Sequence, residues 1–476
     1  MSIDIFDVVP APAELFSVYL NTGTLYDLAC GMVYPCKNNY VVNGGMSNIL
    51  GIAGRSQTYK STIVESFMAR VLSIYPDVKC IEIDSENNKT STSRYNHFAI
   101  NGVEVSKNIR LYDTTTDDIN SVHDKIMDIV NFKTKHAKDM MIETPFLDKN
   151  GDPIRMMTPT LFGIDSFTAL QADGTMEFIG KNDLDDSALN TIWMKSGKNK
   201  TLFMRQLVQY ARKANIYFFL TAHIGENRDL GSHMPPAKQL QFFGQKDKLK
   251  DVGSQFEFLC NTLIKTNSAS TLIDANKECQ YPAEFSTATE LNRVNAAVVR
   301  NKINASGSMI PFIVSQHMGI MNQLTHLQYL KDQKDEVLFT QRGGNMTSNI
   351  YPEVTFTRNN IRAKSEEDYK LERALDLSAQ LIFIKNCWTS FSLPVDISTP
   401  LEKFVDFIMS DKETSNEILS SRSYWTYNKK DPRPMFTIFD ILEMINTGKK
   451  PGSKTMVAVK EDIVDKSTKN KTNKAA

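Results

Sequence analysis

The stretch Gly54-Arg55-Ser56-Gln57-Thr58-Tyr59-Lys60-Ser61 is the strongest indication of the fold in this sequence. A short apolar run at 48–53 precedes it, and apolar residues follow at spacings of three and four over 60–74. This pattern predicts a buried strand, a polar loop and a helix packed on one face. A helix start offers free backbone N–H groups and a partial positive charge, which together favour a bound phosphate. The stretch therefore predicts a phosphate-binding loop between a strand and a helix.

The loop residues are expected to hold a nucleotide and its metal ion. Lys60 is predicted to reach the β- and γ-phosphates, and the Ser61 hydroxyl is predicted to hold Mg²⁺. Tyr59 stands where the G-x-x-x-x-G-K-[ST] pattern has its second glycine, which normally lets the backbone approach a ligand. A polar turn between a strand and a helix is the alternative interpretation. The residues predicted to contact the nucleotide are Gly54, Arg55, Ser56, Gln57, Thr58, Tyr59, Lys60, Ser61 and Thr62.

Composition restricts the class of protein. The chain has 476 residues, 41% hydrophobic and 23% charged, which is ordinary for a globular protein of two or three domains. Lys+Arg and Asp+Glu both number 55, so only a local basic surface would indicate a nucleic-acid partner. Six scattered cysteines without a C-x-x-C pair favour a reduced cytosolic protein over a disulfide or zinc scaffold. The chain has neither an apolar run of about 18 residues nor a basic signal-peptide start, so we expect a soluble, non-secreted protein outside membranes.

Two further strands are predicted to end in carboxylates. The strand 78–83 leads into Asp84-Ser85-Glu86, and the strand 159–164 leads into Asp165-Ser166. Ligands of open α/β sheets lie at the carboxyl ends of the strands. Glu86 is therefore placed to act as a base on water, and Asp165 is placed to bind the Mg²⁺ shell. The alternatives are a first-turn helix acid for Glu86 and an ordinary strand end for Asp165.

A fourth strand, 216–222, is predicted to end in His223, which is placed to touch a γ-phosphate; a histidine bonded to backbone is the alternative. Residues 225–255 are predicted to form a long loop rich in Gly, Pro and Lys. Loops of this length are often functional, and interleaved cations and aromatics suit single-stranded nucleic acid. A solvated insertion is the alternative. The residues predicted to bind DNA are Arg228, Lys238, Phe242, Phe243, Lys246, Lys248 and Lys250.

The sequence predicts further structural elements and a polar tail besides these strands and loops. Arg300 and Lys302 share one face of a predicted hairpin strand; they are either edge charges or cations that reach a neighbour's active site. The tail from Gly448 is polar and lysine-rich, so we expect it to be disordered. Further strands are predicted at 109–112 and 255–265, and a hairpin is predicted at 295–303 and 309–315. Helices are predicted at 117–135, about 200–213, 366–387 and 401–410. One polar stretch is predicted to end at 153, and another is predicted over 171–200.

Taken in order, these motifs resemble the RecA-like recombinases, and most closely the UvsX-type recombinases of tailed phages. The resemblance implies that Glu86 activates water, that His223 senses the γ-phosphate and that Tyr95 stacks on adenine. It also implies that 171–200 and 225–255 are DNA-binding loops. The motifs that carry the resemblance are Thr22-Gly23, Asp27-Leu28-Ala29, Gly44-Gly45-Met46, the aromatic Tyr59 before the loop lysine, Asp84-Ser85-Glu86, Ile164-Asp165-Ser166, Ala222-His223 and the basic segment 298–303.

The same resemblance implies a fold and a division of the chain. The expected fold is α/β, a P-loop NTPase core of RecA-like type with a mainly parallel twisted sheet flanked by helices. The expected parts are an N-terminal arm at 1–20, the ATPase core at 21–325, a smaller, mostly helical C-terminal domain at 326–447 and a basic tail at 448–476.

The expected function is ATP-dependent homologous recombination and repair of DNA. The resemblance implies a DNA-dependent ATPase that uses ATP and Mg²⁺, binds single-stranded DNA and promotes strand exchange as a homo-oligomer or filament. ATP would lie between protomers, with Arg300 and Lys302 supplied by the neighbour. We expect a cytoplasmic location, in a bacterial host if the chain is phage-encoded. The alternatives are a DnaB-like replicative helicase and a non-catalytic recombinase paralogue that binds ATP and DNA.

Overall fold

The computed structural model describes residues 18–36, 39–86, 91–112, 118–148, 150–171, 188–226, 241–244, 247–253, 255–281, 285, 287–388 and 393–448. The strands of its main sheet are β3 (Ile49–Gly54), β4 (Lys79–Asp84), β5 (Ile109–Tyr112), β8 (Thr160–Asp165), β9 (Ile216–Glu226), β10 (Asp247–Leu249), β11 (Thr262–Thr271), β12 (Leu291–Asn301), β13 (Met309–Ser315) and β14 (Gly319–Ile320). Two smaller sheets contain β1 (Met32–Cys36), β2 (Asn39–Asn43), β6 (Met141–Leu147) and β7 (Pro153–Met157), and β15 (Phe339–Arg342), β16 (Asn345–Ser348) and β17 (Tyr351–Phe356).

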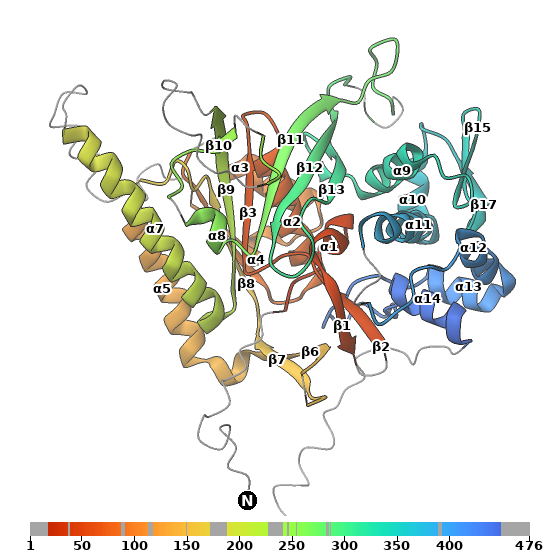
Figure 1. The fold of residues 1–476 in the computed structure, drawn as a ribbon, viewed down its shortest axis with the longest axis horizontal. Coiled ribbons are helices and arrows are strands. Elements are labelled where there is room, and N and C mark those ends of the chain that lie inside the picture. Colours follow the sequence, from red (N-terminus) through yellow and green to blue (C-terminus); the bar gives the residue numbers. More distant parts are fainter. Residues whose placement is uncertain are drawn as a thin grey trace, which may run out of the picture.

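The main sheet runs through the centre of the molecule in the order β14-β13-β12-β11-β3-β9-β8-β4-β5, with β10 paired to β9 (Figure 1). The five pairs from β11 to β5 are parallel. The pairs on the β14 side of β11, and the β9–β10 pair, are antiparallel. The predicted α/β fold with a mainly parallel central sheet is therefore confirmed.

Helices surround this sheet. Figure 1 shows α5 and α7 together on one side of it, and α9 to α14 beyond its other side. None of the helices in the described part of the chain combines the length and apolarity needed to cross a bilayer. The helices are α1 (Leu25–Cys30), α2 (Lys60–Ile74), α3 (Ser91–Ile100), α4 (Val105–Asn108), α5 (Ile119–Lys135), the 3₁₀ turn η2 (Ala137–Met140), α7 (Ala188–Ala214), α8 (Phe256–Leu259), α9 (Asn322–Gln333), α10 (Ile361–Glu367), α11 (Tyr369–Cys387), α12 (Leu401–Ser410), α13 (Lys412–Leu419) and α14 (Ile438–Thr447).

Both faces of the sheet are buried, which explains the nearly continuous apolar runs of its strands. Along β9, Tyr217 and Phe219 join the core shared with α2 and the C-terminal helices. Phe218 and Leu220 join the opposite core, which α5 and α7 complete. Successive side chains of a strand point to opposite faces, so one strand supplies both cores.

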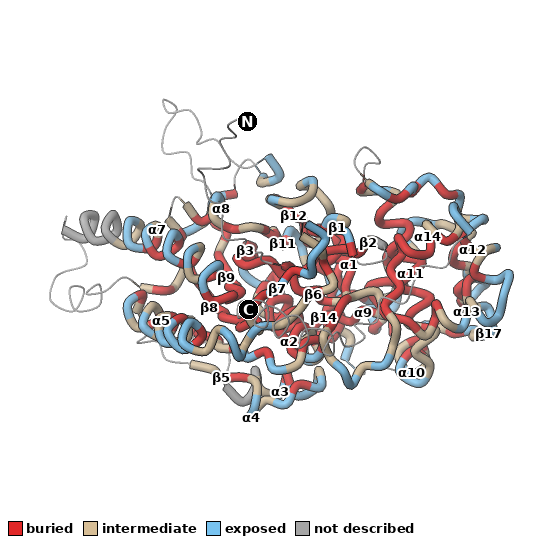
Figure 2. Tube along the Cα trace, turned by 90° about the horizontal axis from the view of Figure 1, so that it is seen from below, coloured by how far each residue is buried: buried red, intermediate tan, exposed pale blue. Residues whose placement is uncertain are grey.

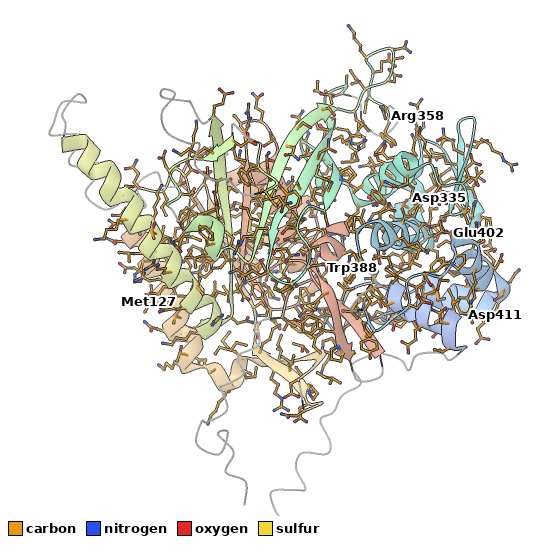
Figure 3. The ribbon with its side chains drawn as sticks, viewed as in Figure 1. Met127, Asp335, Arg358, Trp388, Glu402 and Asp411 are labelled. Atoms are coloured by element: carbon orange, nitrogen blue, oxygen red, sulfur yellow. The ribbon has the colours of Figure 1, made fainter. Side chains whose placement is uncertain are left out.

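The C-terminal part packs directly on the first core. Helix α11 is buried along most of its length (Figure 2). Trp388, which follows it, lies between the sheet and the C-terminal helices (Figure 3). Its indole Nε1 donates a hydrogen bond of 3.1 Å to the Leu28 carbonyl, and its ring centroid lies 5.5 Å from that of Phe439. These contacts join the last third of the chain to α1.

Several sequence predictions need correction. Residues 188–200, predicted as part of a polar stretch, form the first half of α7. The predicted strand 255–265 begins with α8, and its sheet pairing starts only at Thr262. The polar stretch before 153 contains β6, and the region beyond 325 contains β15 to β17. These strands are short and partly exposed, so no strong period of two marked them.

The chain between the arm and the phosphate loop also differs from expectation. Residues 18–20, assigned to the arm, are buried, and Leu20 pairs with Met46. Residues 25–43, for which the sequence predicted no helix or strand, contain α1 and the β1–β2 hairpin. The hairpin 291–301 and 309–315, the helix α5 and the strand β5 agree with the predictions.

Candidate functional site

Four parallel strands bring their polar ends to one edge of the sheet. Gly54 at the end of β3 is paired with His223 of β9. Asp84 at the end of β4 is paired with Asp165 at the end of β8. In an open α/β sheet this carboxyl edge is where ligands bind. The structure thus brings these four positions together, although His223 lies inside β9, which continues to Glu226 beyond the strand end predicted from the sequence.

The phosphate loop is closed tightly around Gly54. A Cβ atom built on Gly54 would lie 1.9 Å from Thr266 Oγ1 and 2.5 Å from Thr58 Oγ1, so no larger residue fits without a rearrangement. The Thr58 and Thr266 hydroxyls are 2.7 Å apart and hydrogen-bonded. Thr58 Oγ1 also donates to the Arg55 carbonyl at 2.8 Å. These contacts fasten the loop to β11.

Two residues of the loop have left-handed backbone conformations. Gln57 has φ 59° and Tyr59 has φ 60°. A bulky side chain is strained there, whereas glycine adopts this region without a steric penalty. Tyr59 therefore keeps the backbone shape that the missing second glycine would give. The substitution that looked like an objection to a phosphate loop is structurally accommodated.

Helix α2 presents its first turn at this edge. Its N-cap residue Tyr59 makes no side-chain capping hydrogen bond, which leaves first-turn amides available for an anion. Lys60 is only 8% exposed, and its Nζ donates to the Arg55 carbonyl at 2.9 Å. Burial lowers the pKa of Lys60, and the negative charges of Asp165 and Glu86 oppose that shift. The ammonium thus lies within the electrostatic reach of both acids.

Glu86 is held by two side chains from neighbouring strand ends. Its Oε1 lies 2.6 Å from His223 Nε2, and it accepts a short hydrogen bond from the Ser166 hydroxyl. Ser85 and Ser166 are also joined, because Ser85 Oγ donates to the Ser166 carbonyl at 2.7 Å and accepts from the Ser166 amide at 2.9 Å. The carboxylate is therefore oriented at the sheet edge rather than free to rotate.

Asp165 is the more buried of the two acids. It is 4% exposed, and its Oδ1 accepts a hydrogen bond of 2.6 Å from the Thr221 hydroxyl. Together with the Ser61 hydroxyl it offers hard oxygen donors, the type that Mg²⁺ prefers. Among the described residues no group of three His, Cys, Asp or Glu side chains could hold a metal by itself. Two protein oxygens fit a Mg²⁺ ion that takes its other ligands from phosphates and water.

Arg300 and Lys302 do not reach this edge within one chain. Arg300 pairs with Leu263, and Leu263 pairs with Gly51, three residues before Gly54. At the usual strand rise this places Arg300 about 10 Å from the loop end of the sheet. Arg300 and Lys302 instead donate to the carbonyls of Phe258 and Leu259 at 3.4 Å and 3.3 Å. A role in catalysis would require that they act on a neighbouring copy.

Tyr95, predicted to stack on adenine, contacts other parts of the chain. It is half-buried against the core, and its hydroxyl accepts a hydrogen bond of 3.4 Å from the Leu111 amide. These contacts hold Tyr95 in place but do not test whether it stacks on adenine, which stays a prediction.

The predicted DNA-binding residues fall into two groups. Arg228, Lys238 and Lys246 lie outside the described residues. Lys248 and Lys250 are exposed on and just after β10. Phe242 lies over the hairpin turn, where a Cβ built on Gly307 would be 2.8 Å from its ring. The Phe243 ring centroid lies 5.5 Å from Lys265 Nζ. Both aromatics thus cover the β11–β12 side of the sheet.

The sequence did not reveal several residues that support the site. Lys200 of α7 is 3% exposed and donates to the carbonyls of Thr168 and Asp251, each at 2.7 Å. Thr168 in turn accepts from the His223 amide at 3.0 Å. Burial lowers the pKa of Lys200 to about 8. Arg55 forms ion pairs with Glu226 and Asp247. No local pattern connects residues so far apart in the sequence.

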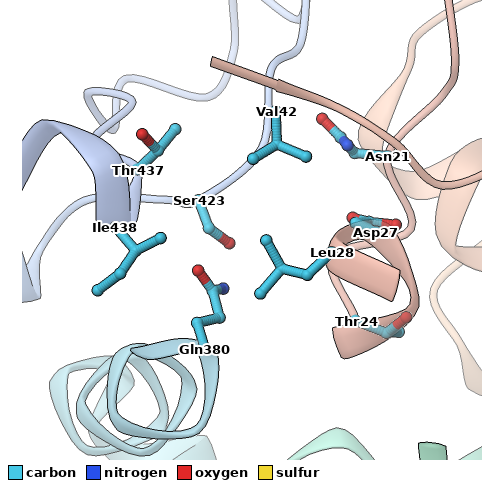
Figure 4. A pocket seen from close by; sticks show the side chains of 9 residues that line it. All are labelled: Asn21, Thr24, Asp27, Leu28, Val42, Gln380, Ser423, Thr437 and Ile438. Carbon is cyan, nitrogen blue, oxygen red and sulfur yellow. The ribbon is translucent and has the colours of Figure 1, made fainter. Parts of the chain in front are cut away.

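A small cavity lies elsewhere, between α1 and the C-terminal helices (Figure 4). Its volume of about 20 Å³ suits a single water molecule and not a nucleotide. Burial raises the pKa of Asp27, one of its lining residues, to about 6, although hydrogen bonds from Thr22 and Gly23 oppose the shift. The lining residues are Asn21, Thr24, Asp27, Leu28, Val42, Gln380, Ser423, Thr437 and Ile438.

Comparisons with known proteins give a weak structural similarity and no match in sequence. No protein-family model matches the sequence, and no curated protein matches it significantly. A solved structure that does match is a crystal structure of the RadB recombinase, at 14% sequence identity and a TM-score of 0.31. The match covers 58% of this chain and 92% of that chain. A similarity of this size decides neither fold nor function.

Proposed function

We propose that this chain is a RecA-like, DNA-dependent ATPase that acts in homologous recombination. The observation that carries the proposal is the gathering of Lys60, Asp165 and Glu86 at one sheet edge, beside the first turn of α2. A cation, two acids and free helix amides are the groups that phosphoryl transfer from a nucleotide requires.

Each residue has a role in this proposal. Lys60 turns from the Arg55 carbonyl to the phosphates, and the α2 amides bind their oxygens. Ser61 and Asp165 hold Mg²⁺, which neutralises charge on the phosphates when it is bound. Glu86 orients the attacking water and accepts its proton. His223, which lies in β9 and is bonded to Glu86, is the group that meets a γ-phosphate.

Charged residues away from the nucleotide site support the proposed binding partners. Lys248 and Lys250 are exposed after β9, next to His223, whose carbonyl accepts from the Lys250 amide at 2.9 Å. The exposed cations support single-stranded DNA as a ligand, and the backbone contact places Lys250 beside His223. Arg300 and Lys302 on the opposite edge support a homo-oligomer in which they reach the neighbour's nucleotide. Tyr95 as the adenine contact, the four-part division of the chain and a cytoplasmic location belong to the same proposal.

Two alternatives predict different behaviour. A DnaB-like helicase would form rings and unwind forked duplexes. A non-catalytic paralogue would bind ATP without turning it over, but the fixed orientation of Glu86 has no purpose in such a protein.

The proposal is tested by nucleotide-dependent DNA binding. Fluorescence anisotropy of a labelled single-stranded oligonucleotide should show tighter binding when Mg·ATP is added to the wild-type chain. Lys60→Ala should abolish this gain, because the phosphates lose their main cation, whereas the exposed Lys107→Ala should retain it. Electron microscopy of the DNA complex should show filaments. Rings, or DNA binding that ignores ATP, would contradict the recombinase assignment.

A further inference from the structure

Arg55, the first residue after Gly54, faces two acids that belong to a different part of the site. Its guanidinium lies 3.6 Å (Nη1) from Glu226 Oε1 and 3.4 Å (Nη2) from Asp247 Oδ1. Glu226 is the last residue of β9 and Asp247 is the first residue of β10. The Arg55 side chain therefore bridges the two residues that flank the segment 227–246.

The two acids need a cation between them. Glu226 and Asp247 are direct partners in the antiparallel β9–β10 pair. Like charges at directly opposed positions weaken strand pairing. In the described part of the chain, Arg55 is the one cation within 4 Å of Glu226. The pairing at this end of the strands thus depends on where the Arg55 side chain lies.

Asp247 has a second, more stable partner. Lys265 Nζ lies 2.5 Å from Asp247 Oδ2, and both side chains are about nine-tenths buried. The Gly244 amide also donates to Asp247 Oδ2 at 3.0 Å. Burial alone would raise the pKa of Asp247, but hydrogen bonds from Lys265, Gly244 and Arg55, together with the charge of Lys265, lower it. Asp247 therefore stays charged and anchored when Arg55 moves, and Glu226 is the acid left without its cation.

Arg55 is well placed to exchange partners. Its side chain is 52% exposed, and that of Glu226 is 63% exposed, so solvent screens their ion pair and keeps it weak. A guanidinium binds phosphate oxygens in a bidentate, charge-assisted way. The Arg55 carbonyl also accepts hydrogen bonds from Lys60 Nζ and Thr58 Oγ1. When Lys60 turns to a phosphate, the backbone of Arg55 loses one of these bonds.

We propose that Arg55 is a positioning residue that couples occupancy of the phosphate loop to the pairing of β9 with β10. Bound triphosphate draws Arg55 from Glu226 and Asp247, and the repulsion between these acids then loosens the strand pair next to residues 227–246. The inference rests on the proposed nucleotide binding and adds a path from the nucleotide to the segment predicted to bind DNA.

Hydrogen exchange of the β10 amides tests this coupling. The probe is Mg·AMPPNP, and the readout is deuterium uptake of peptides covering 247–250, measured by mass spectrometry. In the wild-type chain, saturating nucleotide should speed this exchange about fivefold, the size of effect that a weak ion pair supports. Binding of AMPPNP is measured separately by calorimetry on the same samples.

Two variants are expected to change the response in opposite directions. Arg55→Met should give fast β10 exchange already without nucleotide, and no further gain with it. Glu226→Gln removes the like-charge repulsion, so exchange should stay slow with or without nucleotide. Arg342→Met, an exposed arginine at the end of β15, serves as the control and should behave as wild type.

The outcomes separate the two proposals. If the wild-type chain does not bind AMPPNP, the proposed function itself fails. If it binds and the β10 exchange is unchanged, or if Arg55→Met responds to nucleotide as the wild type does, only the coupling through Arg55 is overturned.

Discussion

His223 Nε2 lies 2.6 Å from Oε1 of Glu86, although His223 belongs to β9 and Glu86 follows β4, and β8 lies between these two strands in the sheet. The bond connects the proposed base to β9, the strand that carries Glu226 at its end. While His223 bonds Oε1, the carboxylate is fixed in orientation and that oxygen is engaged. We infer that a γ-phosphate arriving at this edge competes for His223 and so changes the state of Glu86.

Replacing His223 should therefore affect turnover more than affinity. His223→Ala is expected to lower kcat for ATP hydrolysis by between about tenfold and a hundredfold, less than removal of the base itself. Nucleotide affinity should change little, because in the proposed site Lys60 and the α2 amides make most of the phosphate contacts. Steady-state kinetics with calorimetric binding measures both quantities, with His136→Ala as control. A loss confined to affinity would refute the role of His223 in orienting Glu86.

Glycine at position 57 should stabilise the fold. Gln57 is exposed and has φ 59°, so its side chain contributes strain and little packing. Gln57→Gly is expected to raise the free energy of unfolding by about 0.5–1 kcal/mol. The neighbouring Ser56→Gly lacks this strain relief and should lower it by a similar amount. Urea unfolding compares the pair, and a destabilised Gln57→Gly would show that the loop backbone is not strained there.

A side chain at position 54 should disrupt the loop. In Gly54→Ala the new Cβ would overlap the Thr266 hydroxyl, so the loop must move away from β11. We expect a loss of about 1–3 kcal/mol in unfolding free energy and a loss of ATP binding. Gly197→Ala is the matched control, because a Cβ there meets no atom within 4 Å and alanine favours the α7 helix. Normal ATP binding by Gly54→Ala would contradict the closed loop geometry.

The buried Lys133 should make stability depend on pH. Burial lowers its pKa from 10.5 to about 7, so between these values the unfolded chain binds the proton that the native chain has released. Stability therefore rises with pH across this window, by at most about 1.4 kcal/mol per pH unit. Lys133→Met should flatten the rise measured by urea unfolding between about pH 7 and pH 9. The exposed Lys135→Met should retain it, and an unchanged slope in Lys133→Met would exclude Lys133 as the cause.

The sequence predicted the candidate site best where residues lie at the carboxyl ends of parallel strands. Glu86 follows β4, Asp165 ends β8 and His223 lies near the end of β9, and parallel strands bring such positions together. The backbone conformation of the loop could not be predicted from the sequence. Only the structure shows that Tyr59 adopts the left-handed region that a glycine would occupy.

Contacts between distant segments left no trace in the sequence pattern. Arg55 and Asp247 are 192 positions apart, and their ion pair depends on the fold as a whole. Lys200 was expected in a polar stretch, but it is buried at the junction of α7 with the loops after β8 and β10. The hydrogen bonds of Lys200 go to backbone carbonyls, which every residue carries, so no spacing of side-chain types could have predicted them.

Activation of water by Glu86 is the step on which the proposed DNA-coupled ATPase depends. Its most direct test is steady-state ATP hydrolysis with and without single-stranded DNA, for the wild-type chain, Glu86→Gln and the exposed control Glu353→Gln. We predict that DNA stimulates hydrolysis by the wild type and the control, and that Glu86→Gln binds ATP but loses about a hundredfold or more of the turnover. Wild-type protein that binds ATP without hydrolysing it, or Glu86→Gln with undiminished turnover, would contradict this account.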